Sequence, residues 1–368
     1  MSPSKRMNLL ILFIVMGLFV SACGSDDTTE TTETTAAAAA ETTIPMVATT
    51  MVEMTTTTVA PTTTTTEAID ESAVLAAHIT AALADWSPTI SAEALFENLS
   101  DGDESNDPFI LSVRAPDAYA LGHIEGAYNI PWKEIADPAN LAKLPTDQPI
   151  VVYCYTGHTG QVAATLLRIF GYDATNLKFG MMGWTDDDTI LATARYTGAP
   201  GYPTETEANE LTVEYEPPTL TTGETAAVDI AIASAQSFLA DWGPTTSAEA
   251  LFENLSDGDD ANNPFVLSVR APDAYALGHV EGAYNIGWKA IADPASLAML
   301  PSDEQIIVYC YTGHTGQVAA TALKLLGYDS VNMKFGMMDW TDDDAVLATG
   351  RYTGAPGYPT ETVINELP

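Results

Sequence analysis

The amino-acid sequence contains the same long segment twice. A shift of 156 residues superimposes residues 83–204 on residues 239–360 without a gap, and 96 of the 122 aligned positions are identical. A period of this length matches a whole domain rather than the short unit of a solenoid. Two prolines and a threonine cluster at 211–224 interrupt the pattern between the copies. The sequence therefore predicts two equivalent domains, at 69–210 and 226–368, joined by a linker at 211–225.

Residues 1–22 have the pattern of a secretory signal peptide. Lys5 and Arg6 precede an apolar run at 7–22, which is shorter than the roughly 20 apolar residues of a membrane-spanning helix. The run ends in VSAC at 20–23, which resembles the lipobox of bacterial lipoproteins. This resemblance implies that Cys23 is diacylated and anchors an exported chain to the cell membrane, facing the outside or the periplasm. An uncleaved membrane anchor is the alternative, and it gives the same compartment.

Residues 23–68 form a threonine-rich, low-complexity segment without aromatic residues. Such a segment cannot bury enough apolar surface to offset the entropy of ordering it. We therefore expect a disordered stalk between the membrane anchor and the two domains.

The composition excludes some classes of function. The chain has 50 acidic and 13 basic residues, for a formal net charge of −37. Nucleic acid is excluded as a partner, because binding phosphates requires a basic surface. Three cysteines in 368 residues are too few for a disulfide scaffold.

Apolar runs alternate with helical patterns inside each copy. Strands are predicted at 109–113, 150–153, 174–178 and 306–309, and helices at 92–99, 137–144 and 160–170. Strand–helix–strand units of this length favour parallel pairing with right-handed crossovers. The fold class predicted for each copy is α/β, with a small parallel sheet flanked by helices.

A cysteine follows a predicted buried strand in each copy. Cys154 and Cys310 each begin the sequence CYTGHTG, which leads into a predicted helix. Ligands bind at the carboxyl ends of strands in open parallel sheets. A loop of small residues at a helix start can aim several backbone N–H groups at one point, which stabilises an anion and favours the thiolate. The pattern indicates a nucleophilic cysteine; a buried, inert cysteine is the alternative.

Three motifs in each copy resemble the rhodanese-type sulfurtransferases. LSVR at 111–114 and GHIEGAYNIP at 122–131 are similar to the family's strand and its GHI-x-GA-x-NIP signature, and the second copy has LSVR at 267–270 and GHVEGAYNI at 278–286. KFGMMGW at 178–184 is similar to the closing G-x-x-x-W. The resemblance covers about residues 75–204 and 231–360.

This resemblance implies a tandem rhodanese-like sulfurtransferase. The thiolates of Cys154 and Cys310 would take a sulfane sulfur from a small donor such as thiosulfate, form a persulfide, and pass the sulfur to a thiol or cyanide acceptor. Arg114 and Arg270 would bind the anionic donor, with a structural ion pair as the alternative. The persulfide would be cradled by the loop residues Tyr155, Thr156, Gly157, His158, Thr159 and Gly160, and Tyr311, Thr312, Gly313, His314, Thr315 and Gly316. We expect no cofactor and no bound metal.

The sequence departs from the family pattern in its charges. Ser112 and Ser268 stand where the family usually has Asp, and the cysteine loop contains no Arg or Lys. The loop therefore lines a neutral pocket, or a cationic one if His158 is protonated. Gly160 and Gly316 stand where related phosphatase loops carry Arg, which argues against phosphoryl transfer. A second hypothesis is a surface-tethered persulfide or thiol relay, or a protein-binding module, with a protein as the sulfur acceptor.

Other recurring residues have structural interpretations. His123 and His279 lie in the GHI/GHV turn, where we expect them to bond to the backbone. The paired methionines at 181–182 and 337–338 and the tryptophans are expected in the core.

Overall fold

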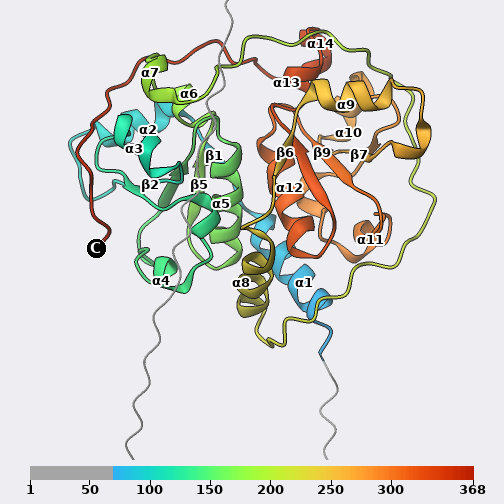
Figure 1. Cartoon of the computed structure of the whole chain (residues 1–368), viewed down its shortest axis with the longest axis horizontal. Helices are drawn as coiled ribbons and strands as arrows, with labels where there is room; N and C mark the ends of the chain where they lie inside the picture. Colours follow the sequence, from blue (N-terminus) through green and yellow to red (C-terminus); the bar gives the residue numbers. More distant parts are fainter. Residues whose placement is uncertain (1–68) are drawn as a thin grey trace, which may run out of the picture. The chain divides into compact units, whose positions relative to one another are not determined.

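The computed structural model describes residues 69–368, in which each copy forms a five-stranded, all-parallel sheet flanked by helices (Figure 1). The strand order is β1-β5-β4-β2-β3 in the first copy and β6-β10-β9-β7-β8 in the second. The strands of the first copy are β1 (Thr89–Ile90), β2 (Phe109–Ser112), β3 (Tyr128–Asn129), β4 (Ile150–Tyr153) and β5 (Ala174–Leu177). Those of the second are β6 (Thr245–Thr246), β7 (Phe265–Ser268), β8 (Tyr284–Asn285), β9 (Ile306–Tyr309) and β10 (Ser330–Met333). The predicted fold class is confirmed.

The helices repeat in the same order in the two copies. The first copy has α1 (Glu71–Ala84), α2 (Ala92–Leu99), α3 (Pro116–Leu121), η1 (Trp132–Glu134), α4 (Pro138–Leu141), α5 (His158–Ile169), α6 (Gly180–Trp184) and α7 (Asp188–Leu191). The second has α8 (Ala227–Phe238), α9 (Ala248–Leu255), η2 (Asp260–Asn262), α10 (Pro272–Leu277), η3 (Trp288–Ala290), α11 (Pro294–Leu297), α12 (His314–Leu325), α13 (Met337–Trp340) and α14 (Asp344–Leu347).

The predicted helix at 137–144 is wrong in its extent. The structure has only α4, whose first turn is capped by the Asp137 carboxylate accepting the Ala139 N–H at 2.8 Å. The N–H groups of Lys143 and Leu144 bond three residues back rather than four. Pro145 follows directly, and it disfavours the α conformation at the residue before it.

The core lies on both faces of the sheets and is shared by the copies. Side chains alternate along β4, so Ile150 and Val152 face α5 while Val151 and Tyr153 face the opposite side. Helix α5 packs against its counterpart α12, and α1 packs against α8 (Figure 1). One continuous apolar cluster therefore runs through both copies on the α5/α12 side. The paired methionines are fully buried in the second cluster, as predicted.

The chain segments that follow α7 and α14 cross to the other copy. We call residues 195–211 arm 1 and residues 351–367 arm 2. Glu205 of arm 1 pairs with His279, and Glu361 of arm 2 pairs with His123, in isolated antiparallel bridges. Figure 1 shows the C-terminal segment running from α14 across to the first copy. Each copy is thus completed by the arm of the other.

None of the helices in residues 69–368 is long and apolar enough to cross a membrane. The expected signal peptide, the lipidated Cys23 and the stalk lie outside the described residues.

Candidate active site

The two cysteines lie where the central strands end. Cys154 follows β4 and Cys310 follows β9, and each strand has a neighbour on both sides. The Gly157 N–H donates to Cys154 Sγ at 3.2 Å. Each cysteine residue is only 1% exposed. The sequence predicted this position, and the burial of the thiols is also what its alternative, a buried and inert cysteine, would give.

The loop after Cys154 leaves a set of backbone donors free. Gly157, with φ +88°, turns the chain into α5, which begins at His158. Within residues 69–368, the N–H groups of residues 155, 156 and 158–160 have no protein hydrogen-bond acceptor. Unpaired amides at a helix start attract negative charge. The arrangement can therefore stabilise a thiolate or a persulfide.

An asparagine on the neighbouring strand holds this loop in place. Asn176 Nδ2 on β5 donates to the Gly157 carbonyl at 3.0 Å and to Gln161 Oε1 at 3.2 Å. Asn332 makes the same bond to the Gly313 carbonyl at 3.0 Å. The sequence analysis missed these residues. The available signal was a polar residue that disfavours strands, retained in both copies within a predicted strand.

The turn after β5 supports the cysteine from behind. The N–H groups of Met181 and Met182 donate to the carbonyls of Cys154 and Tyr155, at 2.9 and 2.8 Å. The turn begins at Phe179, which has a left-handed backbone (φ +64°). A non-glycine residue in this conformation is strained, and such strain is often found at functional sites.

The two arginines proposed for donor binding are buried structural groups in this conformation. Arg114 is 0% exposed, and its guanidinium donates to the carbonyls of Gly122 (2.6 Å) and Ile190 (3.3 Å). Arg270 is held by the equivalent groups. The expected alternative, an ion pair with an acid, is wrong, because the acceptors are uncharged carbonyls. Donor binding by these arginines stays a hypothesis from the family resemblance, while the contacts in the structure give both arginines a structural role.

The loop histidines face each other between the copies. The His158 and His314 rings lie 5.6 Å apart, centre to centre, and both residues are buried. Burial lowers the pKa of His314 to about 3 and that of His158 well below its usual value. Both rings are therefore neutral near pH 7, so the cationic pocket considered from the sequence is wrong.

The other recurring histidines bind backbone, as predicted. His123 contacts the carbonyls of Tyr119 and Val363 through its two ring nitrogens, each at 2.9 Å. His279 bonds in the same way to the carbonyls of Tyr275 and Glu207. In the described part of the chain, no three His, Cys, Asp or Glu side chains are grouped to hold a metal ion.

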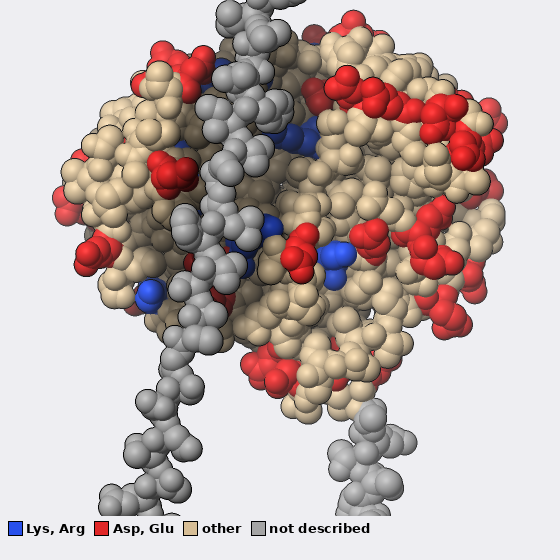
Figure 2. Space-filling view, in the orientation of Figure 1, with Lys and Arg blue, Asp and Glu red and all other residues tan. Residues whose placement is uncertain are grey.

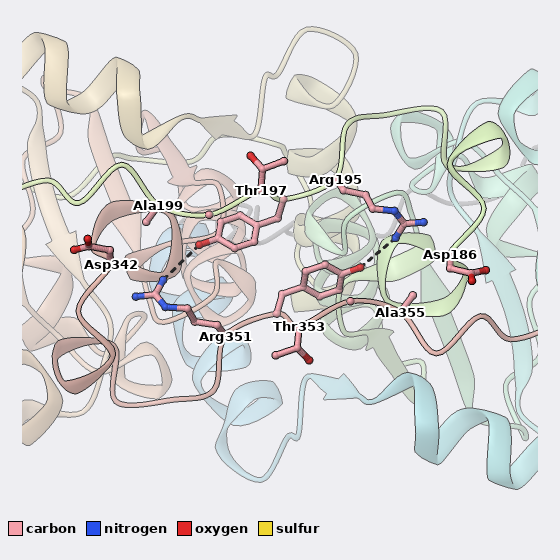
Figure 3. Close-up of a pocket in the computed structure, with 12 residues that line it drawn as sticks. Asp186, Arg195, Thr197, Ala199, Asp342, Arg351, Thr353 and Ala355 are labelled. Carbon is pink, nitrogen blue, oxygen red and sulfur yellow. Dashed lines mark hydrogen bonds between the residues drawn. The ribbon is translucent and has the colours of Figure 1, made fainter.

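A separate cavity of about 680 Å³ lies between the crossing arms. Figure 3 shows Arg195 and Arg351 on opposite sides of it, each bonded to a tyrosine of the other arm. Each arginine is also paired with an aspartate, Asp188 or Asp344. Figure 2 shows groups of acidic side chains on an otherwise largely uncharged surface, with fewer basic ones. A small anion approaching the protein therefore meets a surface whose charged groups are mostly acidic.

A family model and several known proteins are similar to this chain. The family model described as "Rhodanese-like domain" matches residues 91–187 and 247–343. A "Sulfurtransferase" of Allochromatium vinosum is 30% identical over 96 residues, covering 26% of this chain and 85% of that protein.

Two further relatives match over 76 residues at 37% identity, which is 20% of this chain. The match covers 68% of the "Thiosulfate sulfurtransferase GlpE" of Pseudomonas fluorescens. It covers only 19% of the "Probable adenylyltransferase/sulfurtransferase MoeZ" of Mycobacterium tuberculosis, so the chain spans about a fifth of that protein. Since the family model matches more than half of the residues, the chain belongs to the rhodanese-like domain family and carries two of its domains in tandem.

Proposed function

We propose that the protein is a sulfurtransferase that moves a sulfane sulfur through a persulfide on Cys154 and on Cys310. The donor is a small anion of the thiosulfate class, and the acceptor is cyanide or a thiol. Family membership and the names of the relatives support this activity. The observation that carries it is the Cys154 sulfur at the end of β4, bonded to the Gly157 N–H and followed by free amides at the start of α5.

The proposed reaction has two steps. The cysteine thiolate attacks the sulfane sulfur of thiosulfate; a new S–S bond forms, the S–S bond of thiosulfate breaks, and sulfite leaves with the electron pair. Cyanide or a thiolate then attacks the outer sulfur of the persulfide, and the cysteine thiolate is regenerated. Free loop amides would stabilise the negative charge on the outer sulfur in the intermediate.

The enclosure of the thiol favours a small donor. Cys154 is 1% exposed, while its loop neighbours Tyr155 and Thr159 are partly exposed. A relay that exchanges sulfur or disulfides directly with a folded protein requires a thiol that the partner can reach. We therefore rank the relay, with a protein as acceptor, below transfer between small molecules.

The test compares full-length wild-type protein with Cys154→Ala, Cys310→Ala and the double variant in a steady-state thiosulfate:cyanide assay. Each single variant should keep part of the activity, and the double variant should have none. Mass spectrometry after thiosulfate treatment should show one added sulfur, about 32 Da, on each of the two thiols. Full activity in the double variant would overturn the proposal. Absence of the adduct together with rapid mixed-disulfide formation would favour the relay.

We further propose that the protein works at the outer face of the cell membrane, anchored by lipid on Cys23. A two-chain lipid is needed because a single acyl chain holds a protein only marginally. Metabolic labelling with palmitate should mark the wild-type protein and not Cys23→Ala. Equal labelling of both would contradict lipidation at this residue.

A further inference from the structure

Each loop histidine accepts a hydrogen bond from the backbone of the other copy. His314 Nε2 accepts the Phe179 N–H at 3.1 Å, and His158 Nε2 accepts the Phe335 N–H at 3.0 Å. The two loops are in close contact around these hydrogen bonds, because a Cβ on Gly157 would lie only 2.5 Å from His314 Nε2. The two cysteine loops therefore touch at their histidines.

The hydrogen bonds define which ring nitrogen carries the proton. A backbone N–H can only donate, so Nε2 of each histidine is unprotonated. The proton is on Nδ1, which donates to the hydroxyl of Thr156 or Thr312 in the same loop at 3.0 Å. Each ring thus bonds its own loop through Nδ1 and the other copy through Nε2.

The backbone that each histidine holds leads directly to the other copy's cysteine. Phe179 begins the turn whose Met181 N–H donates to the Cys154 carbonyl. Gly180 in this turn lies so close to that carbonyl that no side chain fits. In the second copy, Phe335 begins the equivalent turn, and the Met337 N–H donates to the Cys310 carbonyl at 3.0 Å.

We propose that His158 and His314 are positioning residues that act between the copies. His314 of the second copy fixes the backbone behind Cys154, and His158 of the first fixes the backbone behind Cys310. Neither cysteine loop is complete without the other copy, so the duplication is part of the sulfur-transfer site. This inference rests on the proposed function.

Two substitutions of His314 separate its two bonds. His314→Gln places an acceptor near the position of Nε2 and keeps the bond to the Phe179 N–H, while it loses the donor toward Thr312. His314→Asn keeps a donor near the position of Nδ1 and cannot reach Phe179. Each is made in full-length Cys310→Ala, where only Cys154 remains, and in Cys154→Ala, where only Cys310 remains.

His314→Asn should lower the sulfur-transfer rate of Cys154 by about tenfold or more, because small displacements of reacting groups are costly. The same substitution keeps a donor toward Thr312 in the Cys310 loop, so it should lower the rate of Cys310 less than that of Cys154. His314→Gln should restore most of the Cys154 rate. His158→Asn should give the mirror result, lowering the rate of Cys310 more than that of Cys154. Thermal unfolding midpoints of the Asn and Gln variants measure any general loss of folding.

The outcomes separate this inference from the proposed function. If the single-cysteine parents transfer no sulfur, the proposed function fails. If the parents are active and His314→Asn slows Cys310 more than Cys154, or slows both equally, the action between the copies is refuted while the sulfurtransferase remains. Equal rates for the Asn and Gln variants at Cys154 would also refute it.

Discussion

Phe96 and Tyr358 stack face to face, with ring centres 4.0 Å apart and planes 9° apart, although Phe96 is on α2 of the first copy and Tyr358 is in arm 2. Tyr202 of arm 1 stacks on Phe252 of α9 in the same way, at 4.1 Å. The Trp184 indole donates to the Pro359 carbonyl beside the first stack at 2.9 Å. Arm 1, which follows the first copy in the sequence, thus packs on the core of the second copy, and arm 2 packs on the core of the first.

Tyr358→Ala should lower the free energy of unfolding of the protein. The stacked pair contributes about 0.5–1.5 kcal/mol beyond the burial of its area, and the arm also loses its aromatic contact. Tyr202→Ala should have a similar effect because the second stack is equivalent. Urea denaturation measures both, with Val213→Ala at a 54% exposed position as the control. An unchanged midpoint in both tyrosine variants would show that the arms add no stability.

Gly157→Ala should be much more damaging than Gly102→Ala. The two glycines have almost the same left-handed backbone, with φ +88° and φ +84°, so a side chain costs about the same backbone strain at each. A Cβ meets nothing within 4 Å at Gly102, whereas at Gly157 it meets His314 Nε2 and the Phe179 N. Overpacking should cost Gly157→Ala about 1–3 kcal/mol more. Equal unfolding free energies in the two variants would mean that the two copies are not in close contact at this loop.

Arg114→Met should destabilise the protein and leave the KM for thiosulfate unchanged. The substitution removes the donors of the Gly122 and Ile190 carbonyls, and each buried carbonyl left without a donor costs about 1–3 kcal/mol. Steady-state kinetics measured at a temperature well below the unfolding midpoint separate a change in KM from the loss of stability. A large rise in KM with unchanged stability would instead support the donor-binding role expected from the family resemblance.

The local features of each copy could be predicted from the sequence. Helix α2 and strands β4 and β9 have the predicted bounds, because residue periodicity and flanking turn signals act over short distances. The cysteine loop was also located correctly, since a strand followed by small residues and a helix places it at the carboxyl edge of the sheet.

The exchange of the arms could not be predicted, and the duplication itself is the reason. Phe96 and Phe252 lie in the identical sequence AEALFENL, and Tyr202 and Tyr358 both lie in GYPT. Contacts within a copy and contacts between copies therefore use the same residue types, so the pattern cannot distinguish them. The role of His314 could not be predicted for the same reason: its motif places it in a loop but does not show that this loop contacts the equivalent loop of the other copy.

The unfolding free energy should fall as the pH is lowered from 7, because of the loop histidines. The pKa of His314 is lowered to about 3 by burial, and that of His158 is lowered in the same direction. In the unfolded chain these rings take up a proton near pH 6.5, so below that pH the unfolded state binds more protons than the folded state. This stability is fully present above pH 6.5 and is lost toward pH 3. His314 should account for a loss of about 2 kcal/mol between pH 7 and pH 5, and His158 should add a loss of the same sign.

The comparison that isolates this effect is between wild-type protein and His314→Gln. Asp339, whose pKa is raised by burial to about 6, contributes with the opposite sign, and its contribution is common to both proteins. The free energy of unfolding, measured in urea at several pH values, should fall more steeply with decreasing pH in the wild-type protein than in His314→Gln. The difference between the two curves should be the contribution of one histidine. Parallel curves would show that the His314 ring is not buried in its neutral form.

Alkylation of the two loop cysteines should depend on salt when the reagent is an anion and not when it is neutral. The formal net charge of −37 repels anions at long range, and the repulsion extends about 30 Å at 0.01 M salt but only about 8 Å at 0.15 M. The same thiolate attacks the CH2 carbon of iodoacetate and of iodoacetamide and displaces iodide, and the two reagents have nearly the same size. Raising the salt concentration should therefore increase the rate of alkylation by iodoacetate several-fold and leave the rate with iodoacetamide almost unchanged. Mass spectrometry of the Cys154 and Cys310 peptides measures both rates. The rate of sulfur transfer from thiosulfate should show the same kind of salt dependence as alkylation by iodoacetate, because both reagents are anions. If both reagents show the same salt dependence, the acidic surface does not control the approach to the thiols.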